Sequence, residues 1–96
     1  MGFELSLEMS LSREEFLRLL PAAVGQAAVQ EGTDGHFSGR DGERRWVLRL
    51  VPLAARRLGS VVLPCHRVEI RLDSYSDNEA KAFLARFHRG FQRGGG

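Results

Sequence analysis

Two stretches decide the fold of this chain: RWVLRLV at residues 45–51 and RVEIRLD at residues 67–73. In both, apolar side chains recur at every second position; the residues that alternate with them are all charged in the second stretch, and are two arginines and two valines in the first. Successive residues of a β-strand point to opposite faces, so this alternation predicts two strands with one buried and one solvated face. We expect the two strands to fold back on each other as a long antiparallel pair at the centre of the domain.

The segment between these strands predicts a projecting hairpin. Gly59 and Ser60 have the composition of a turn, and Pro52 and Pro64 stand at similar distances on either side of it. Proline cannot donate a hydrogen bond to a ladder, so each one ends a strand or marks an edge or a bulge. Two prolines opposite each other suit a bent ribbon whose tip spans residues 53–63.

Two helices are predicted from start signals followed by apolar stripes. Ser12 with Glu15 has the spacing of a capping box, and Ser76 with Glu79 repeats it. The stripes that follow have helical spacing and consist of Phe16, Leu19, Leu20 and Ala23 in the first helix and Ala80, Phe83, Leu84, Phe87 and Phe91 in the second.

Pro21 lies inside the first predicted helix. Its ring removes one backbone donor and clashes with the preceding turn, so we expect a kink or a break near Leu20. Gly25 is the expected C-terminal stop, because glycine readily adopts the left-handed conformation that ends many helices.

The remaining strands are shorter. Residues 3–9 alternate apolar side chains with glutamate and serine, which predicts a strand with one buried face. A further short strand is expected at Gly35–Gly39, pairing with the Trp46 strand through a turn at residues 40–43. The order strand–helix–three strands–helix favours a two-layer α+β sandwich, with both helices on one face of an antiparallel sheet of about four strands.

The composition is that of a globular domain, with 43% hydrophobic and 27% charged residues. A chain of 96 residues can bury one core, so we expect a single domain over residues 1–93 and a flexible glycine tail at residues 94–96. The single cysteine excludes an internal disulfide, and no apolar run approaches the ~20 residues that span a bilayer. We expect a cytoplasmic protein that does not enter membranes.

Charge is unevenly distributed along the chain. Residues 1–35 hold six acidic residues and two arginines, net −4, whereas residues 36–96 hold twelve basic and six acidic residues, net +6. Thirteen of the fourteen bases are arginine, whose planar fork suits carboxylate or phosphate. A GC-rich coding sequence produces the same bias. Because the acids are interleaved with the bases, we expect many arginines to pair with neighbouring carboxylates.

No catalytic residue, metal ligand set or cofactor site is predicted. Cys65 and His66 could form a nucleophile–base pair or ligate a metal, but adjacent strand residues point to opposite faces. His36 and His88 are the only other histidines, so a zinc site would lack ligands. The sequence also lacks a GxxxxGK[ST] loop and a GxGxxG loop between a strand and a helix.

One hypothesis, which we place third, is a small-ligand-binding or enzymatic domain without an identifiable reaction. Two resemblances to known families are relevant here. The glycines at residues 94–96 are similar to the diglycine end of ubiquitin-like sulfur carriers, but those chains reach their glycines from a strand. The element order is similar to that of helix-grip domains, which hold apolar ligands between a sheet and a C-terminal helix. Here Phe83, Phe87 and Phe91 are expected to fill that space.

The first hypothesis is therefore a non-catalytic protein-interaction module or a homodimer, and the second is a nucleic-acid-binding accessory protein. For the first, an unknown protein partner or a second copy would contact the hairpin tip through apolar and basic side chains, namely Leu53, Arg56, Arg57, Leu58 and Val62. For the second, the bases of the C-terminal helix, Arg86, Arg89 and Arg93, would contact phosphate together with the tip arginines.

Overall fold

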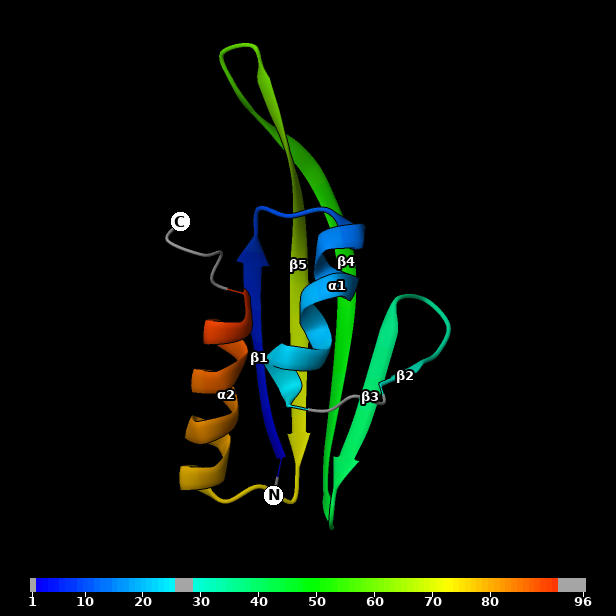
Figure 1. Cartoon of the computed structure of the whole chain (residues 1–96), viewed down its shortest axis with the longest axis vertical. Coiled ribbons are helices and arrows are strands. Elements are labelled where there is room, and N and C mark those ends of the chain that lie inside the picture. The colour runs from blue at the N-terminus through cyan, green and yellow to red at the C-terminus, as the bar shows by residue number, and fades with distance from the viewer. Residues whose placement is uncertain (1, 26–28, 92–96) are drawn as a thin grey trace.

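The computed structural model describes residues 2–25 and 29–91. The elements in chain order are β1 (Gly2–Met9), α1 (Arg13–Val24), β2 (Gln30–Glu31), β3 (His36–Asp41), β4 (Arg44–Leu58), β5 (Val61–Asp73) and α2 (Asp77–Phe91). The strands form one antiparallel sheet in the order β1-β5-β4-β3-β2, and both helices cover the same face of it (Figure 1). The predicted α+β class and the placement of the helices are confirmed.

One hydrophobic core fills the layer between sheet and helices. The alternation of the central strands is confirmed, because Trp46, Leu48, Leu50, Val68, Ile70 and Leu72 are all buried. The helices face them with Phe16, Leu20, Ala23, Ala80, Phe83 and Phe87. Aromatic rings make up much of this layer: Phe87 lies 4.8 Å from Phe91, which lies 5.2 Å from Phe16, measured between ring centroids.

The sheet differs from the expected one in strand number. The described residues form five strands, because the two-residue β2 pairs with the first half of β3. A strand of two residues has no periodicity to recognise, and it lies in the glycine-rich part of the chain. β3 also runs two residues further than expected, to Asp41, and it joins β4 through a tight turn at Gly42 and Glu43.

The break predicted in the first helix is wrong, because α1 continues through Pro21 to Val24. The helix begins as expected: the Ser12 hydroxyl accepts from the Glu15 N–H at 3.2 Å, and the Ser12 N–H donates to the Glu15 carboxylate at 3.2 Å. Gly25 ends it with a φ of 68°. Only three helical residues follow Pro21, so the backbone donor that its ring removes lies close to the end of the helix.

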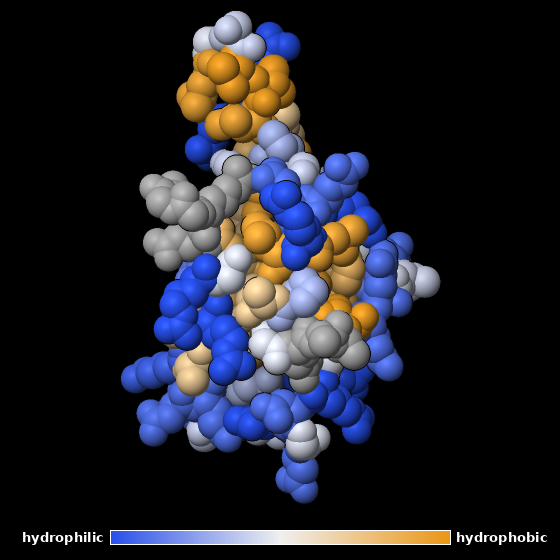
Figure 2. All heavy atoms as spheres, in the orientation of Figure 1, coloured by the Kyte–Doolittle hydropathy of each residue, from blue (hydrophilic) through white to orange (hydrophobic). Residues whose placement is uncertain are grey.

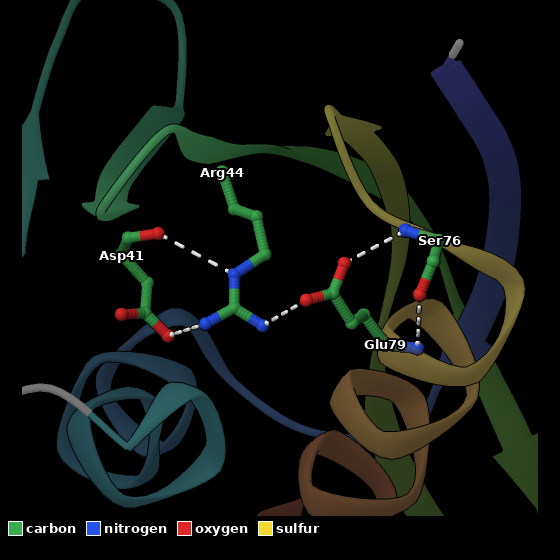
Figure 3. A network of polar contacts seen from close by, with 4 residues as sticks. All are labelled: Asp41, Arg44, Ser76 and Glu79. Carbon is green, nitrogen blue, oxygen red and sulfur yellow. Dashed lines mark hydrogen bonds and ion pairs between the residues drawn. The ribbon is translucent and has the colours of Figure 1, made fainter.

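A polar network ties the start of α2 to the β3–β4 turn (Figure 3). Arg44 donates to the Asp41 carboxylate at 2.8 Å and to the Glu79 carboxylate at 2.9 Å. Glu79 in turn accepts from the Ser76 N–H at 2.9 Å, while the Glu79 N–H donates to the Ser76 hydroxyl at 3.2 Å. This completes the predicted capping box and joins it to the sheet through one guanidinium.

Glu79 should make the stability of the protein depend on acid pH. The hydrogen bond from the Ser76 backbone N–H, supported by Arg44, lowers the pKa of Glu79 below its ordinary 4.5. A lowered folded-state pKa adds stability above the unfolded pKa, and this contribution is lost as the pH falls through the folded pKa. Glu79→Gln should therefore lower the denaturation midpoint at pH 7, and its difference from wild type should shrink as the pH falls to 3, which urea titrations at both pH values would measure.

Glu43→Gln is the matched control for this prediction, because it removes the same charge from the exposed β3–β4 turn outside the network. A difference between wild type and Glu79→Gln that is equally large at both pH values would contradict the assignment.

Candidate functional site

The central hairpin projects beyond the rest of the domain (Figure 1). β1 ends at Met9, opposite His66 of β5, and on the other side the Gly35 carbonyl accepts from the Leu50 N–H at 2.9 Å, just before β3 begins. Past these points β4 and β5 pair only with each other, and the molecule reaches 47 Å along its longest axis. We call residues 53–63 the ribbon.

The ribbon closes at the predicted turn. Leu58 pairs with Val61, so Gly59 and Ser60 form a two-residue loop. Gly59 has a φ of 62°, and Ser60 is not among the described residues with positive φ. Positive φ at only the first loop position is the type II′ pattern, which matches the twist of the flanking strands.

Both prolines face the outer edges of the two strands. The backbone N–H groups of a strand point alternately to its two neighbours, and that of Leu50 points to Gly35. The nitrogen of Pro52 therefore faces the same edge, beyond the start of β3. In β5 the odd-numbered residues bond to β4, so the nitrogen of Pro64 faces the β1 edge, beyond Met9. Each proline lies where the sheet narrows, at a position whose N–H would have had no partner strand.

A β-bulge lies at the base of the ribbon. Leu53 pairs with Cys65 and Arg56 pairs with Leu63, so the two alanines 54 and 55 oppose the single residue Pro64. A bulge of this kind bends a strand and increases its local twist. Figure 1 shows the two strands crossing in projection above the body of the domain, as such a twist requires.

The bulge gathers apolar side chains on one face of the ribbon. Residues that pair directly across an antiparallel ladder point to the same face, so Leu53, Leu58, Val61 and Leu63 share a face with Arg56. We call these four apolar residues the lane. Val62 and Arg57 pair with each other on the opposite face.

The tip of the ribbon is apolar and open to solvent. Leu58, Val61 and Val62 are 58%, 53% and 54% exposed, and they are the exposed large hydrophobic residues of the described chain. Figure 2 shows hydrophobic residues gathered at the projecting tip, and a second hydrophobic area in the middle of the visible face of the body, surrounded by hydrophilic residues. Solitary exposed apolar residues are ordinary on a protein surface, but here three lie at one tip, Leu58 and Val61 on the lane face and Val62 on the other.

The charge of the ribbon is wholly positive. Arg56 and Arg57 are exposed, and neither makes an ion pair with any residue that the structure describes. The sequence has no aspartate or glutamate from residue 44 to residue 68. Other arginines of that stretch reach carboxylates outside it, as Arg44 does with Glu79 at 2.9 Å.

The structure divides the five predicted tip residues between the two faces of the ribbon, with Leu53, Arg56 and Leu58 on the lane face and Arg57 opposite them. Val62, the fifth, lies beside Arg57 rather than on the lane. The predicted contact set leaves out Val61, although it belongs to the predicted tip, and Leu63, both of which lie on the lane. The sequence contains a signal for Val61: once the two-residue loop is placed at Gly59 and Ser60, Leu58 and Val61 must pair across it.

The arginines of α2 do not gather with those of the ribbon. Arg86 packs against the C-terminal end of α1, where its guanidinium carbon would lie 3.1 Å from a Cβ placed on Gly25. Arg89 lines a different hollow, beside Leu11 and Phe91. Arg93 is outside the described residues. The ribbon extends away from α2 rather than along it (Figure 1).

The uncovered face of the sheet carries ion pairs. Arg49 and Arg67 lie 3.5 Å and 3.4 Å from the carboxylate of Glu69, and Arg71 lies 3.5 Å from that of Asp73. Trp46 is buried on the opposite face, as predicted. These arginines are therefore engaged with carboxylates of their own sheet.

Cys65 and His66 contact different groups. The His66 Nδ1 lies 2.9 Å from the carbonyl oxygen of Leu11, whereas the Cys65 Sγ lies 3.9 Å from the Ser10 hydroxyl. Within residues 2–25 and 29–91, no three His, Cys, Asp or Glu side chains form a group that could hold a metal ion. Neither of the described helices is long and apolar enough to cross a membrane.

Comparison of the chain with protein-family models, with curated proteins and with solved structures gave no match. Its function has to be inferred from the residues and their geometry.

Proposed function

We propose that this protein is a non-catalytic interaction module that contacts a partner protein through the ribbon. One observation carries the proposal: in the described chain, the exposed large apolar side chains all lie at the tip of a hairpin that leaves the body of the domain. Covering apolar surface contributes about 25 cal/mol per Å², so this tip gains free energy only when something packs on it.

The position of the ribbon supports the same conclusion. A two-stranded hairpin without a third strand or a packed helix is marginally stable in water. Residues 53–63 therefore contribute little to the stability of the free domain, whose core lies between the helices and residues 46–50 and 68–72. An extension that the fold does not require suits a role in binding.

Substitution of the lane tests this proposal. Replacing Leu58 and Val61 together with aspartate should change the free energy of unfolding by no more than ~1 kcal/mol, because both side chains are already exposed. The same double variant should reduce recovery of the partner from source cells at least about tenfold, since two carboxylates would enter an apolar contact. Denaturant titration and quantitative co-purification measure the two effects.

The matched control places two aspartates on α2, at the exposed Ala82 and Ala85, and should leave recovery unchanged. We call the protein with aspartate at both Leu58 and Val61 the lane variant. If it recovers as much partner as wild type does, the ribbon is not the contact surface. Sedimentation velocity tests whether the partner is a second copy. In that case the sedimentation coefficient of wild type rises with protein concentration, and that of the lane variant does not.

A further inference from the structure

We propose that the partner presents an acidic amphipathic helix, which lies along the lane with its apolar side against it and a carboxylate toward Arg56, while Arg57 on the other face of the strand adds to the positive charge of the ribbon. This inference rests on the proposed function and adds the chemistry of the partner. It follows from the edges, the length and the charge of the ribbon.

The edges of the ribbon disfavour recognition by strand addition. A partner strand bonds to outward-facing N–H and C=O groups of an exposed edge. Pro64 provides no such N–H, and Leu63 and Val61 point theirs toward β4, so Val62 is the single outward donor of β5 between Pro64 and the turn. On the other edge Pro52 removes the first donor, and the bulge at alanines 54 and 55 disrupts the next positions.

A helix needs no hydrogen bonds from the ribbon, because its own backbone satisfies them. The lane extends from the pair Leu53–Cys65 to the pair Leu58–Val61. At ~3.4 Å per residue this is roughly 15 Å, or about three turns of helix. An amphipathic helix of that length presents its apolar positions as one stripe, which fits the single apolar face of the lane.

Charge selects the sign of the partner. Arg56 shares the face of the lane and Arg57 lies on the other side of the same strand, and neither has an ion pair in the described chain. A carboxylate at the margin of the partner's apolar stripe would meet a guanidinium that has no ion pair. Arginine and carboxylate can then form two parallel hydrogen bonds.

A second copy docking ribbon to ribbon fits this surface less well. Residues 53–63 contain two arginines and no acidic residue, so two ribbons would bring like charges together without a carboxylate between them. Nucleic acid would supply the negative charge, but the tip offers it three aliphatic side chains and no aromatic ring for a base to stack on.

Binding of three designed helical peptides tests the inference. The peptides would be 18 residues long, fluorescently labelled, with the same leucine stripe flanked by glutamate, glutamine or lysine. At near-physiological salt, wild type should bind the glutamate peptide about tenfold more tightly than the glutamine peptide, and the lysine peptide more weakly than either. Arg56→Glu with Arg57→Glu should reverse the order, so that the lysine peptide binds best.

The control Arg18→Glu with Lys81→Glu makes the same change of charge at exposed helical positions and should keep the wild-type order. If wild type binds the three peptides equally and the lane variant binds none of them, the inference of an acidic partner is wrong. The proposed function would then still hold. If the glutamate peptide does not bind at 100 µM, the inference that the partner presents a helix to the lane is wrong. Tight binding of a 20-nucleotide single-stranded RNA that Arg56→Glu with Arg57→Glu abolishes would identify a nucleic acid instead.

Discussion

Replacing Gly90 with alanine should destabilise the protein by about 2–3 kcal/mol, although alanine is the better helix former by ~1 kcal/mol. Gly90 lies in the last turn of α2, where the two helices cross. A Cβ at this position would overlap the backbone of Ala23 in α1 and lie 2.7 Å from its nitrogen. Backbone atoms cannot rotate away, so the helices would have to move apart and lose contact along their whole crossing.

A second substitution, at the residue that faces Gly90, tests this steric effect. Ala23→Gly removes the methyl group that would lie 2.5 Å from the new Cβ, but the backbone of residue 23 stays in place. The variant with both Gly90→Ala and Ala23→Gly should therefore regain only part of the free energy of unfolding that Gly90→Ala loses. Urea titration measures all three proteins, and a Gly90→Ala variant as stable as wild type would show that the helices cross less closely.

Replacing Phe87 with alanine should cost about 3–5 kcal/mol, the usual range for a fully buried phenylalanine. The side chain is 0% exposed, and its ring lies 4.8 Å from that of Phe91 and 6.2 Å from that of Phe83. Its removal interrupts the aromatic layer between α2 and the sheet. A domain of this size has roughly 5–15 kcal/mol of stability in total, so the variant should melt far below wild type.

Leu84→Ala is the comparison for this second prediction, because Leu84 lies on the same helix and is only partly buried. It should cost clearly less than Phe87→Ala in the same denaturant titration. Equal losses would indicate that α2 packs on the sheet with a different face.

The sequence predicts the central pair of strands and both helices because each has a local physical signal. The alternation around Trp46 and Ile70 reflects one buried face, and the spacing of Ser76 and Glu79 reflects two reciprocal hydrogen bonds. Such signals need only neighbouring residues. β2 has no comparable signal, since its two residues are ordered by pairing with β3.

The composition of the lane could be predicted only in part. Leu53 and Leu58 are five residues apart, so strict alternation places them on opposite faces of a strand. The extra residue of the bulge puts both on the face of Leu63 and Val61. A bulge depends on how two strands align, and only the presence of Pro64 indicated an irregularity there.

Site-specific photo-crosslinking tests the central claim most directly. A photoreactive amino acid at Val61, on the exposed tip, and the same group at Lys81, on the exposed surface of α2, would be compared in source cells. The account predicts one discrete protein adduct from position 61, none from position 81, and loss of the adduct when Leu58 is also replaced by aspartate. An adduct that forms at position 81 and not at position 61 would contradict it.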